Sequence, residues 1–510
     1  MIDRLKNAWL ALFRNYQSAQ PNKTNATRNP QNRSADQESL PPFGADALRA
    51  HARDLVRNNA YASGVVETIV SSVVGTGIKT MSCLETQDGE DVEVFNEIRD
   101  DVWSRWCDVA ELTGQYNWEE VQAIAQREIV EAGEVLIHMV AVPLNFRGIK
   151  RPVPFAVELI EADRLAVDRD TFIYSRSDGR RIVRGVELDE IGKPVAYWIY
   201  PNHPQDFYSI RREPVRIEAD NILHLFRRQR VGQNRGVTWF APVVNWLRDM
   251  GIYVDNEMQA GAVSSCLTAF IKSDTPIQGL QPPGSLPQSD NAGNQFDYLE
   301  PGAIFRLNGG EDVAMVNPLR PNNNAGPWLQ LMQRGIAVGT GLSYEVVARD
   351  YSQTNYSSSR TSQLEDRRRF RMWQRYLINH LCQPVWKRFC ESASMSGLVA
   401  FPSMEQLQAN FERYAPAEHM PQSWEWVDPQ NEQKASTDSI NNFQASYSEE
   451  LGALGKNWRH VFYQRAKEEN LLKKLGLVSP MQQAEALADA QSANAEAAKV
   501  NAVKAGVSED

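Results

Sequence analysis

The chain has 510 residues, of which 42% are hydrophobic and 23% are charged, and its formal net charge at pH 7 is −10. Such a length suffices for about three domains, and the composition is ordinary for a soluble protein. The negative charge argues against a protein that wraps nucleic acid tightly, because such proteins concentrate lysine and arginine to displace counterions. A local or sliding contact with DNA stays compatible with this charge.

Five cysteines without a CxxC pair predict neither a disulfide framework nor a zinc site. The sequence has no run of about 18 uncharged apolar residues, so we expect no membrane span. The apolar stretch 8–13 is too short for the core of a signal peptide. We therefore expect a protein that is made in the cytoplasm.

The chain begins with a polar segment and a helical pattern. Residues 17–43 are rich in Asn, Gln, Ser, Thr and Pro, so residues 1–40 are predicted to be a flexible tail. A helical pattern begins after Gly44, and Gly75 and Gly77 end it.

Two further helices are predicted at 92–109 and 118–132, and the apolar run 135–142 predicts a strand. Residues 150–240 then alternate short apolar runs, among them 182–188, with Gly, Pro and Asp turns. This pattern predicts a β-rich region.

A long helix is predicted from about 241 to 267, with one packed face and one wet face. The apolar stripe consists of Leu247, Gly251, Val254, Met258 and Ala262. The polar residues on the opposite face, which could line a channel or meet a neighbour, are Asn245, Asp249, Asn256 and Glu257.

Residues 272–295 are rich in Pro, Gly, Ser and Gln and are predicted to form an extended loop. Two short strands at 303–307 and 313–316 follow, with Asn308-Gly309-Gly310 as a turn between them. A helix with little charge is then predicted to run from Pro327 to Leu342.

Residues 349–360 form an almost purely polar loop, and loops carry function disproportionately. Its candidate contact residues are Arg349, Tyr351, Gln353, Asn355, Tyr356, Ser357 and Arg360. A long helix is predicted from Thr361 to about Ser396, and it begins with a cluster of arginines. Besides Arg360, these are Arg367, Arg368, Arg369, Arg371 and Arg375.

The arginines could contact DNA phosphates or form ion pairs within or between subunits. We favour ion pairs, because arginine suits bidentate carboxylate contacts and many arginines gripping phosphate would oppose sliding. The polar loop offers weak, sequence-independent contacts that suit a surface past which DNA moves.

No catalytic constellation, metal site or cofactor site is predicted. The stretch 75–80 (GTGIKT) resembles a phosphate-binding loop only superficially, because Ile78 separates Gly77 from Lys79 and the upstream glycine is absent. HExxH and GxSxG motifs do not occur. His138 and His224 lie in apolar strand patterns and are predicted to be hydrogen-bonded core residues.

Four segments resemble phage portal proteins of the lambda type. They are the helix with RNN at 57–59 and VVG at 73–75, the loop 349–360 with the helix after it, WEWVDP at 424–429, and GKNWRHV at 455–461. The resemblance extends from about Gly44 to Leu477.

The resemblance implies an α+β portal fold with wing, stem, clip and crown, in which a small β-containing clip is inserted between long stem helices. The implied domains are a tail (1–40), wing (41–240), stem helix (241–268), clip (269–325), second stem helix (326–342), tunnel loop (343–362), long helix and wing return (363–430), and crown with C-terminal tail (431–510).

It also implies a function and partners. The chain would form a closed, dodecameric ring at a capsid vertex and conduct double-stranded DNA without sequence preference during packaging and ejection. Its implied protein partners are the terminase large subunit, the major capsid protein or scaffold, and a head–tail connector protein. The implied location is the virion, and the host cytoplasm during assembly; neither a membrane nor enzymatic activity is expected.

Two alternatives remain. One is a nucleic-acid-dependent enzyme, a nuclease or NTPase, which ATP turnover lost on Lys79→Ala would support. The other is a different head–tail connector component, which the length of the chain opposes.

Overall fold

The computed structural model describes most of the region from Gly44 to Leu477. The described residues are 44–85, 92–169, 180–206, 213–265, 269–273, 288–289, 295–296, 311–315, 324–398, 400–424, 429–456 and 458–477. The chain divides into two compact units, each built from separate stretches of sequence. Unit 1 comprises 1–68, 124–140 and 156–354, and unit 2 comprises 69–123, 141–155 and 355–510.

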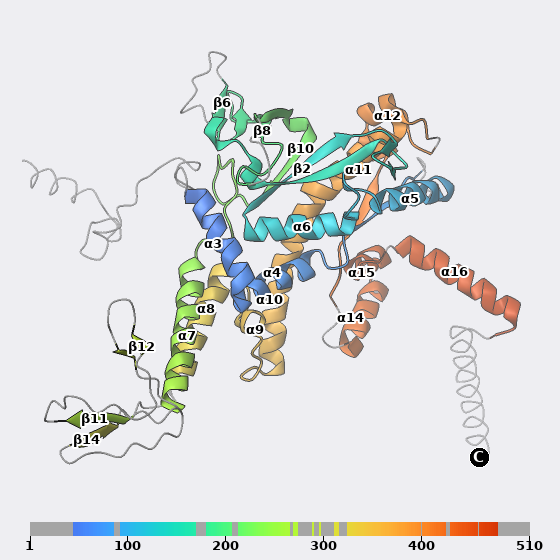
Figure 1. The fold of residues 1–510 in the computed structure, drawn as a ribbon. Coiled ribbons are helices and arrows are strands. Elements are labelled where there is room, and N and C mark those ends of the chain that lie inside the picture. The colour runs from blue at the N-terminus through green and yellow to red at the C-terminus, as the bar shows by residue number, and fades with distance from the viewer. Residues whose placement is uncertain are drawn as a thin grey trace, which may run out of the picture. The chain divides into compact units, whose positions relative to one another are not determined.

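The helical pattern predicted after Gly44 is interrupted once. It forms α3 (Gly44–Asn58) and α4 (Ala60–Val73) (Figure 1). The side chain of Asn59 accepts hydrogen bonds from the backbone N–H groups of Tyr61 and Ala62, at 3.0 and 3.2 Å, and so caps the second helix. Gly75 and Gly77 have positive φ and end the pattern as predicted.

Unit 2 has an aromatic core. It forms where α5 (Glu93–Cys107) and α11 (Gln383–Met395) pack together. Trp103 stacks on Trp106 with ring centroids 4.9 Å apart and meets Phe389 edge-on at 4.9 Å. The Trp106 indole N–H donates to the carbonyl of Phe155 at 2.8 Å, so this buried ring keeps its one polar group satisfied.

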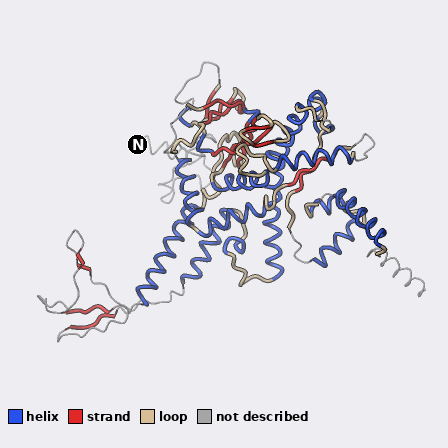
Figure 2. Tube along the Cα trace, turned by 45° about the vertical axis from the view of Figure 1, so that its right-hand side comes forward, coloured by secondary structure: helices blue, strands red, loops and turns tan. Residues whose placement is uncertain are grey.

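Two strand pairs, a three-stranded sheet and a four-stranded meander make up the main sheets, and strands are drawn red in Figure 2. In unit 2, β1 (Lys79–Ser82) pairs with β15 (Ala417–Met420), and β3 (Asn145–Phe146) pairs with β4 (Ile149–Lys150). A three-stranded sheet has the order β10 (Ile222–Phe226), β2 (Glu134–Ala141), β5 (Phe155–Glu161). The meander of unit 1 is β6 (Arg181–Val183), β7 (Val186–Leu188), β8 (Pro194–Ile199) and β9 (Val215–Glu218).

These strands confirm the β-rich character predicted for 150–240 and correct one strand. The predicted strand 182–188 is a hairpin, because Arg184 and Gly185 have φ values of 51° and 87°. Two consecutive positive φ angles build the tight turn that joins antiparallel strands. The meander packs its apolar residues against those of the three-stranded sheet, namely Leu136, Ile160, Val186, Leu188, Tyr197 and Ile199.

The segment between the two long helices of unit 1 contains short strands. β11 (Ala269–Ser273) pairs antiparallel with β14 (Glu311–Met315), and β12 (Gln288–Ser289) pairs with β13 (Gln295–Phe296). The partner of β14 is thus a strand about forty residues upstream. The other predicted strand, 303–307, and its turn at 308–310 lie outside the described residues.

The remaining helices complete the two units. The long helices are α6 (Trp118–Glu131), α7 (Val244–Ser265), α8 (Ala325–Thr340), α10 (Tyr356–Leu377) and α16 (Trp458–Leu475), and the shorter ones are α9 (Tyr344–Ala348), α12 (Met404–Ala409), α13 (Phe411–Tyr414), α14 (Pro429–Asn441) and α15 (Tyr447–Ala453). Single 3₁₀ turns occur at Ala162–Arg164, Val167–Arg169 and Ala219–Asn221. Within the described ranges no helix has the length and apolarity to cross a membrane.

The helix predicted from Thr361 to Ser396 is divided into α10 and α11 by a π-helical turn, Ile378–Cys382. Pro384 begins the next segment. A proline lacks the N–H that would bond four residues back and its ring clashes with that carbonyl, so a widened turn just before it relieves the clash.

Candidate functional site

Helices α7 and α8 form a close antiparallel pair in unit 1 (Figures 1 and 2). Val243 lies against Gly339, Trp246 against Gly335, and Tyr253 stacks near Trp328 with ring centroids 4.1 Å apart. Residues later in α7 therefore contact residues earlier in α8, as in an antiparallel pair. A Cβ atom added at Gly335 would lie 2.3 Å from the Trp246 ring. The glycines of α8 thus permit this close approach.

The polar face predicted for α7 is partly confirmed. Asn245, Asp249 and Asn256 are exposed, whereas Glu257 is half-buried. Asp249 forms an ion pair with the adjacent Arg248 at 2.9 Å.

The predicted apolar stripe of α7 is wrong at its C-terminal end, where Met258 is 69% exposed. The contacts with α8 are made instead by Val243, just before α7, and by Trp246 and Tyr253 within it.

The polar loop is shorter than the sequence predicted. α9 ends at Ala348 and α10 begins at Tyr356 rather than near Thr361. The reason is a reciprocal cap: the Asn355 side chain accepts from the Ser358 N–H at 2.8 Å, and the Ser358 hydroxyl receives the Asn355 N–H at 3.1 Å. Ser357 and Arg360 therefore lie on an exposed first part of α10, and the side chain of Tyr356 is outside the described residues.

Internal hydrogen bonds shape the remaining loop, 349–354. Asp350 accepts from the Tyr344 hydroxyl at 2.9 Å and from the Ser352 hydroxyl at 2.6 Å. The bonds from Ser352 and Tyr344 lower the pKa of Asp350 below its ordinary value. Thr354 donates to the carbonyl of Tyr351 at 2.9 Å. The loop is therefore a folded turn that presents side chains to solvent.

Three predicted loop residues are exposed on this turn. Tyr351 is 51% exposed, and Gln353 and Arg349 are also at the surface. Arg349 has a φ of 54°, which is unusual for a residue with a side chain. Its guanidinium donates to the hydroxyl of Thr68 at 3.1 Å. The start of the loop is thus fixed to the surface next to it in unit 1.

The arginines of α10 have different surroundings. Arg360 lies 3.6 Å from Glu432, Arg369 lies 3.9 Å from Glu365, and Arg371 lies over the Trp424 ring at 5.6 Å. Burial lowers the pKa of Arg367. Arg368 and Arg375 are exposed and form no ion pair within the described ranges. Ion pairing thus accounts for part of the cluster only.

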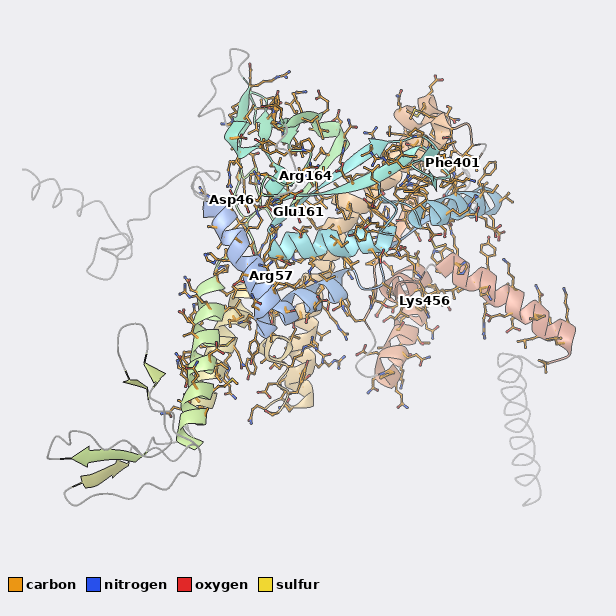
Figure 3. The ribbon with its side chains drawn as sticks, in the orientation of Figure 1. Asp46, Arg57, Glu161, Arg164, Phe401 and Lys456 are labelled. Carbon is orange, nitrogen blue, oxygen red and sulfur yellow. The ribbon has the colours of Figure 1, made fainter. Side chains whose placement is uncertain are left out.

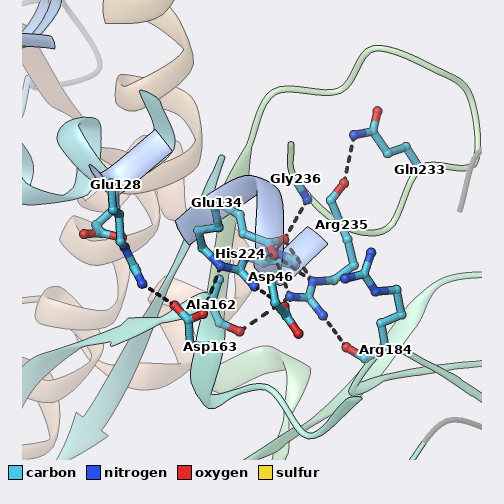
Figure 4. Close-up of polar contacts among 12 residues, drawn as sticks. Asp46, Glu128, Glu134, Ala162, Asp163, Arg184, His224, Gln233, Arg235 and Gly236 are labelled. Carbon is cyan, nitrogen blue, oxygen red and sulfur yellow. Dashed lines mark hydrogen bonds and ion pairs between the residues drawn. The ribbon is translucent and has the colours of Figure 1, made fainter. Parts of the chain in front are cut away.

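Unit 1 also contains a buried ion-pair network that sequence reasoning missed (Figure 4). Both oxygens of Glu134 accept hydrogen bonds from Arg235, the shortest at 2.6 Å, and one accepts the Gly236 N–H at 2.6 Å. The His224 ring lies 3.0 Å from the same carboxylate, and Arg49 lies 3.5 Å from it. His224 is therefore a hydrogen-bonded core residue, as predicted.

The network joins five separate segments of unit 1. Arg49 comes from α3 and also bonds Asp163 at 3.0 Å, and Figure 3 shows α3 near the segment that carries Glu161 and Arg164. Burial alone would raise the pKa of Glu134, but Arg235 and His224 outweigh it and hold the pKa well below its ordinary value. The carboxylate is thus a charged structural centre.

Among the described residues, one cluster could be considered as a metal site and one stretch as a phosphate-binding loop, and the surroundings of both argue against these roles. Glu161, Asp163 and His203 have ligand atoms within 4.8 Å of one another, but Arg49 and Arg53 already pair with Asp163 and oppose a cation. The stretch 75–80 ends α4 and leads into strand β1. A phosphate-binding loop instead follows a strand and opens a helix, so this stretch is the helix-ending turn that was predicted.

Comparison with known proteins shows the family. Residues 22–374 match the phage portal proteins of the lambda family. The chain belongs to this family. The family resemblance stated from the sequence is therefore confirmed. The predicted α+β fold class also agrees with the helices and sheets of the structure.

Portal proteins of several phages are similar to this chain over most of its length. A probable portal protein of Halomonas phage phiHAP-1 is 26% identical over 478 residues, covering 92% of this chain and 89% of that protein. Portal protein B of Escherichia phage lambda is 21% identical over 500 residues, covering 89% and 88%. A solved chain from the neck of a native GTA particle computed with C12 symmetry is 15% identical, covers 82% of this chain and 94% of that chain, and has a TM-score of 0.41.

Proposed function

We propose that the chain is the subunit of a closed, dodecameric ring at a capsid vertex, through which double-stranded DNA enters and leaves. Membership of the lambda portal family carries this proposal. A ring of identical subunits needs a head-to-tail interface whose rotation closes. The net charge of −10 suits a channel, because an acidic wall repels phosphate and lets DNA slide.

The antiparallel pair α7 and α8 supports a stem assignment. The two helices bracket residues 266–324, whose described strands β11 and β14 pair with each other. In the proposed ring, α7 and α8 form the stem, and the bracketed segment forms the clip. The clip docks the terminase large subunit during packaging and a head–tail connector protein afterwards.

The other domains are assigned in the same proposal. Residues 41–240 with the returning stretch 363–430 form the wing, which meets the major capsid protein or scaffold. Residues after 431 form the crown. Assembly takes place in the host cytoplasm before the ring becomes part of the virion.

The proposed channel surface is the turn 349–354 with the exposed start of α10. Tyr351, Gln353 and Arg349 are exposed there, and hydroxyls and amides make sequence-independent contacts with the DNA backbone. On α7, the exposed residues Asn245, Asp249 and Asn256 are the candidates for the channel wall.

Electron microscopy of the purified chain tests the ring. Class averages viewed down the particle axis are expected to show a closed ring with a central hole. A chain that stays monomeric with and without capsid or scaffold proteins would refute the proposal.

A loop replacement tests the channel surface. Residues 351–354 are replaced by Gly and Ser, while Asn355 is kept because it caps α10. The matched control changes the turn Asp189–Lys193, whose Ile191 is 88% exposed, to the same residue types. We expect both variants to form rings and only the first to package or retain less DNA. Equal packaging by the two variants would remove this loop from the channel.

A further inference from the structure

One face of α10 carries apolar and basic residues that the described part of the chain leaves uncovered. Leu364 and Met372 are 42% and 71% exposed. Arg368 and Arg375 lie on the same face, because residues three, four, seven and eight positions apart align on a helix. Neither arginine forms an ion pair within the described part of the chain, and both are exposed. This basic face is defined by Leu364, Arg368, Met372 and Arg375.

A second helix of the same unit has the opposite character. On α5, Val94 and Ile98 are 67% and 46% exposed. Glu97 and Asp101 are exposed on the same side of the helix, again at spacings of three, four and seven residues. Within the described ranges, Asp101 pairs with Arg105 at 2.7 Å. Arg105 is exposed on the same side of the helix, so this side keeps one net negative charge. This acidic face is defined by Val94, Glu97, Ile98 and Asp101.

The two faces match in chemistry but do not cover each other within one chain. Each has two exposed apolar side chains, and the net charges of the two faces are opposite. The two helices, both of unit 2, are labelled in separate places in Figure 1. Large exposed apolar side chains flanked by charge are typical of interaction surfaces.

We propose that the basic face of α10 in one subunit docks on the acidic face of α5 in the next subunit of the ring. Two different faces of one chain then meet head to tail, which is the kind of contact that closes a ring. The apolar pairs form the centre of the contact and the charges fix its register. The proposal rests on the proposed ring and names one of its interfaces.

The apolar residues favour a protein partner over DNA. A phosphate backbone would neutralise Arg368 and Arg375 but would leave Met372 and Leu364 in water. A second helix face covers both kinds of side chain at once. Methionine and arginine are moreover enriched at the centres of protein interfaces.

Charge reversal tests the pairing. One variant carries Arg368→Glu with Arg375→Glu, a second carries Glu97→Arg with Asp101→Arg, and a third combines all four changes. The assembly state of each full chain is followed against concentration by light scattering. We expect the midpoint of assembly to rise at least about tenfold in the first two variants. The third variant should regain much of the loss, because opposite charges face each other again.

A matched control separates the interface from a general effect of charge. Arg413→Glu changes an exposed arginine of the same unit outside both faces and should assemble like the parent chain. Far-ultraviolet circular dichroism checks that each variant keeps its helices.

Cross-linking gives a second measurement that needs no charge reversal. A chain with Ile98→Cys and Met372→Cys should oxidise into a ladder of covalent multimers, because each subunit offers one thiol to each neighbour. Either substitution alone should give no ladder. The described native cysteines are buried or half-buried. Oxidation of the parent chain measures any cross-linking that they contribute.

Three outcomes would overturn the proposal. The first is that both charge variants assemble into rings at the same concentration as the parent chain and that the double-cysteine chain gives no ladder. The second is an arginine variant that assembles normally but binds duplex DNA more weakly, which would make DNA the partner of the basic face. The third is a parent chain that stays monomeric in all conditions, which would remove the ring itself; the first two would leave the ring intact.

Discussion

Replacing Glu134 by glutamine should destabilise unit 1 strongly. The carboxylate is 1% exposed and accepts hydrogen bonds from Arg235 and from the Gly236 N–H. The change leaves the Arg235 guanidinium, itself 3% exposed, without its counter-charge and points an amide N–H₂ at its donors. Breaking one partner of a buried pair costs about 3–5 kcal/mol. We expect a loss of at least about 3 kcal/mol.

Urea unfolding measures this loss. Unfolding is followed by far-ultraviolet circular dichroism, because the 13 tryptophans of the chain belong to both units and their fluorescence would not report on unit 1 alone. With a slope of about 3 kcal/mol/M, a loss of about 3 kcal/mol lowers the midpoint by about 1 M. The control Glu218→Gln removes an exposed carboxylate that pairs with Arg216 and should cost less than about 1 kcal/mol.

A paired replacement decides whether the orphaned charge is the cause. Glu134→Leu combined with Arg235→Met removes both charges, and the double variant should be at least as stable as Glu134→Gln. A cost below about 1 kcal/mol for Glu134→Gln would refute the reasoning. So would a double variant that is clearly less stable than the single one.

Three further changes test other parts of the structure. Gly335→Ala should lower the free energy of unfolding by about 1–3 kcal/mol, because its Cβ would lie 2.3 Å from the Trp246 ring. Adding Trp246→Leu should restore stability in thermal unfolding. An unchanged stability of Gly335→Ala would mean that α7 and α8 are less tightly packed. Asn355→Ala should cost about 1 kcal/mol and Asn355→Asp much less, with faster hydrogen exchange at the Ser358 amide as the readout. Burial raises the pKa of Glu128 to about 7. The folded chain therefore keeps a proton that the unfolded chain releases near pH 4.5. The free energy of unfolding consequently falls as pH rises from about 4.5 through 7. Glu128→Gln should remove about 1–3 kcal/mol of this fall in urea titrations from pH 5 to 8, and an unchanged pH profile would contradict the assignment.

Local signals in the sequence were sufficient to predict most helices and their ends. Gly75 and Gly77 end a helix where predicted, because positive φ suits glycine. The start of α10 was predicted about five residues late, although Asn355 and Ser358 stand at the spacing of a reciprocal cap.

Contacts between distant residues could not be predicted from the sequence. Glu134 meets Arg235 about a hundred residues later, and Arg49 comes from the first described helix. Nothing in the local pattern of any of these residues marks the network. The apolar stripe of α7 was likewise misjudged at Met258, because the position of α8 decides which residues of α7 are covered.

The helices near the C-terminus have an unusual surface. α14 and α16 contain no buried residue, and Leu471 and Leu475 of α16 are 55% and 62% exposed. Helices of 13 and 18 residues gain most of their stability from packing, since isolated helices of this length are marginal in water. Their helix content should therefore depend on protein concentration. Ordering them would use part of the free energy of association, so each added subunit would bind less tightly than its contact area suggests. Such weak early contacts allow a misplaced subunit to leave before the ring closes.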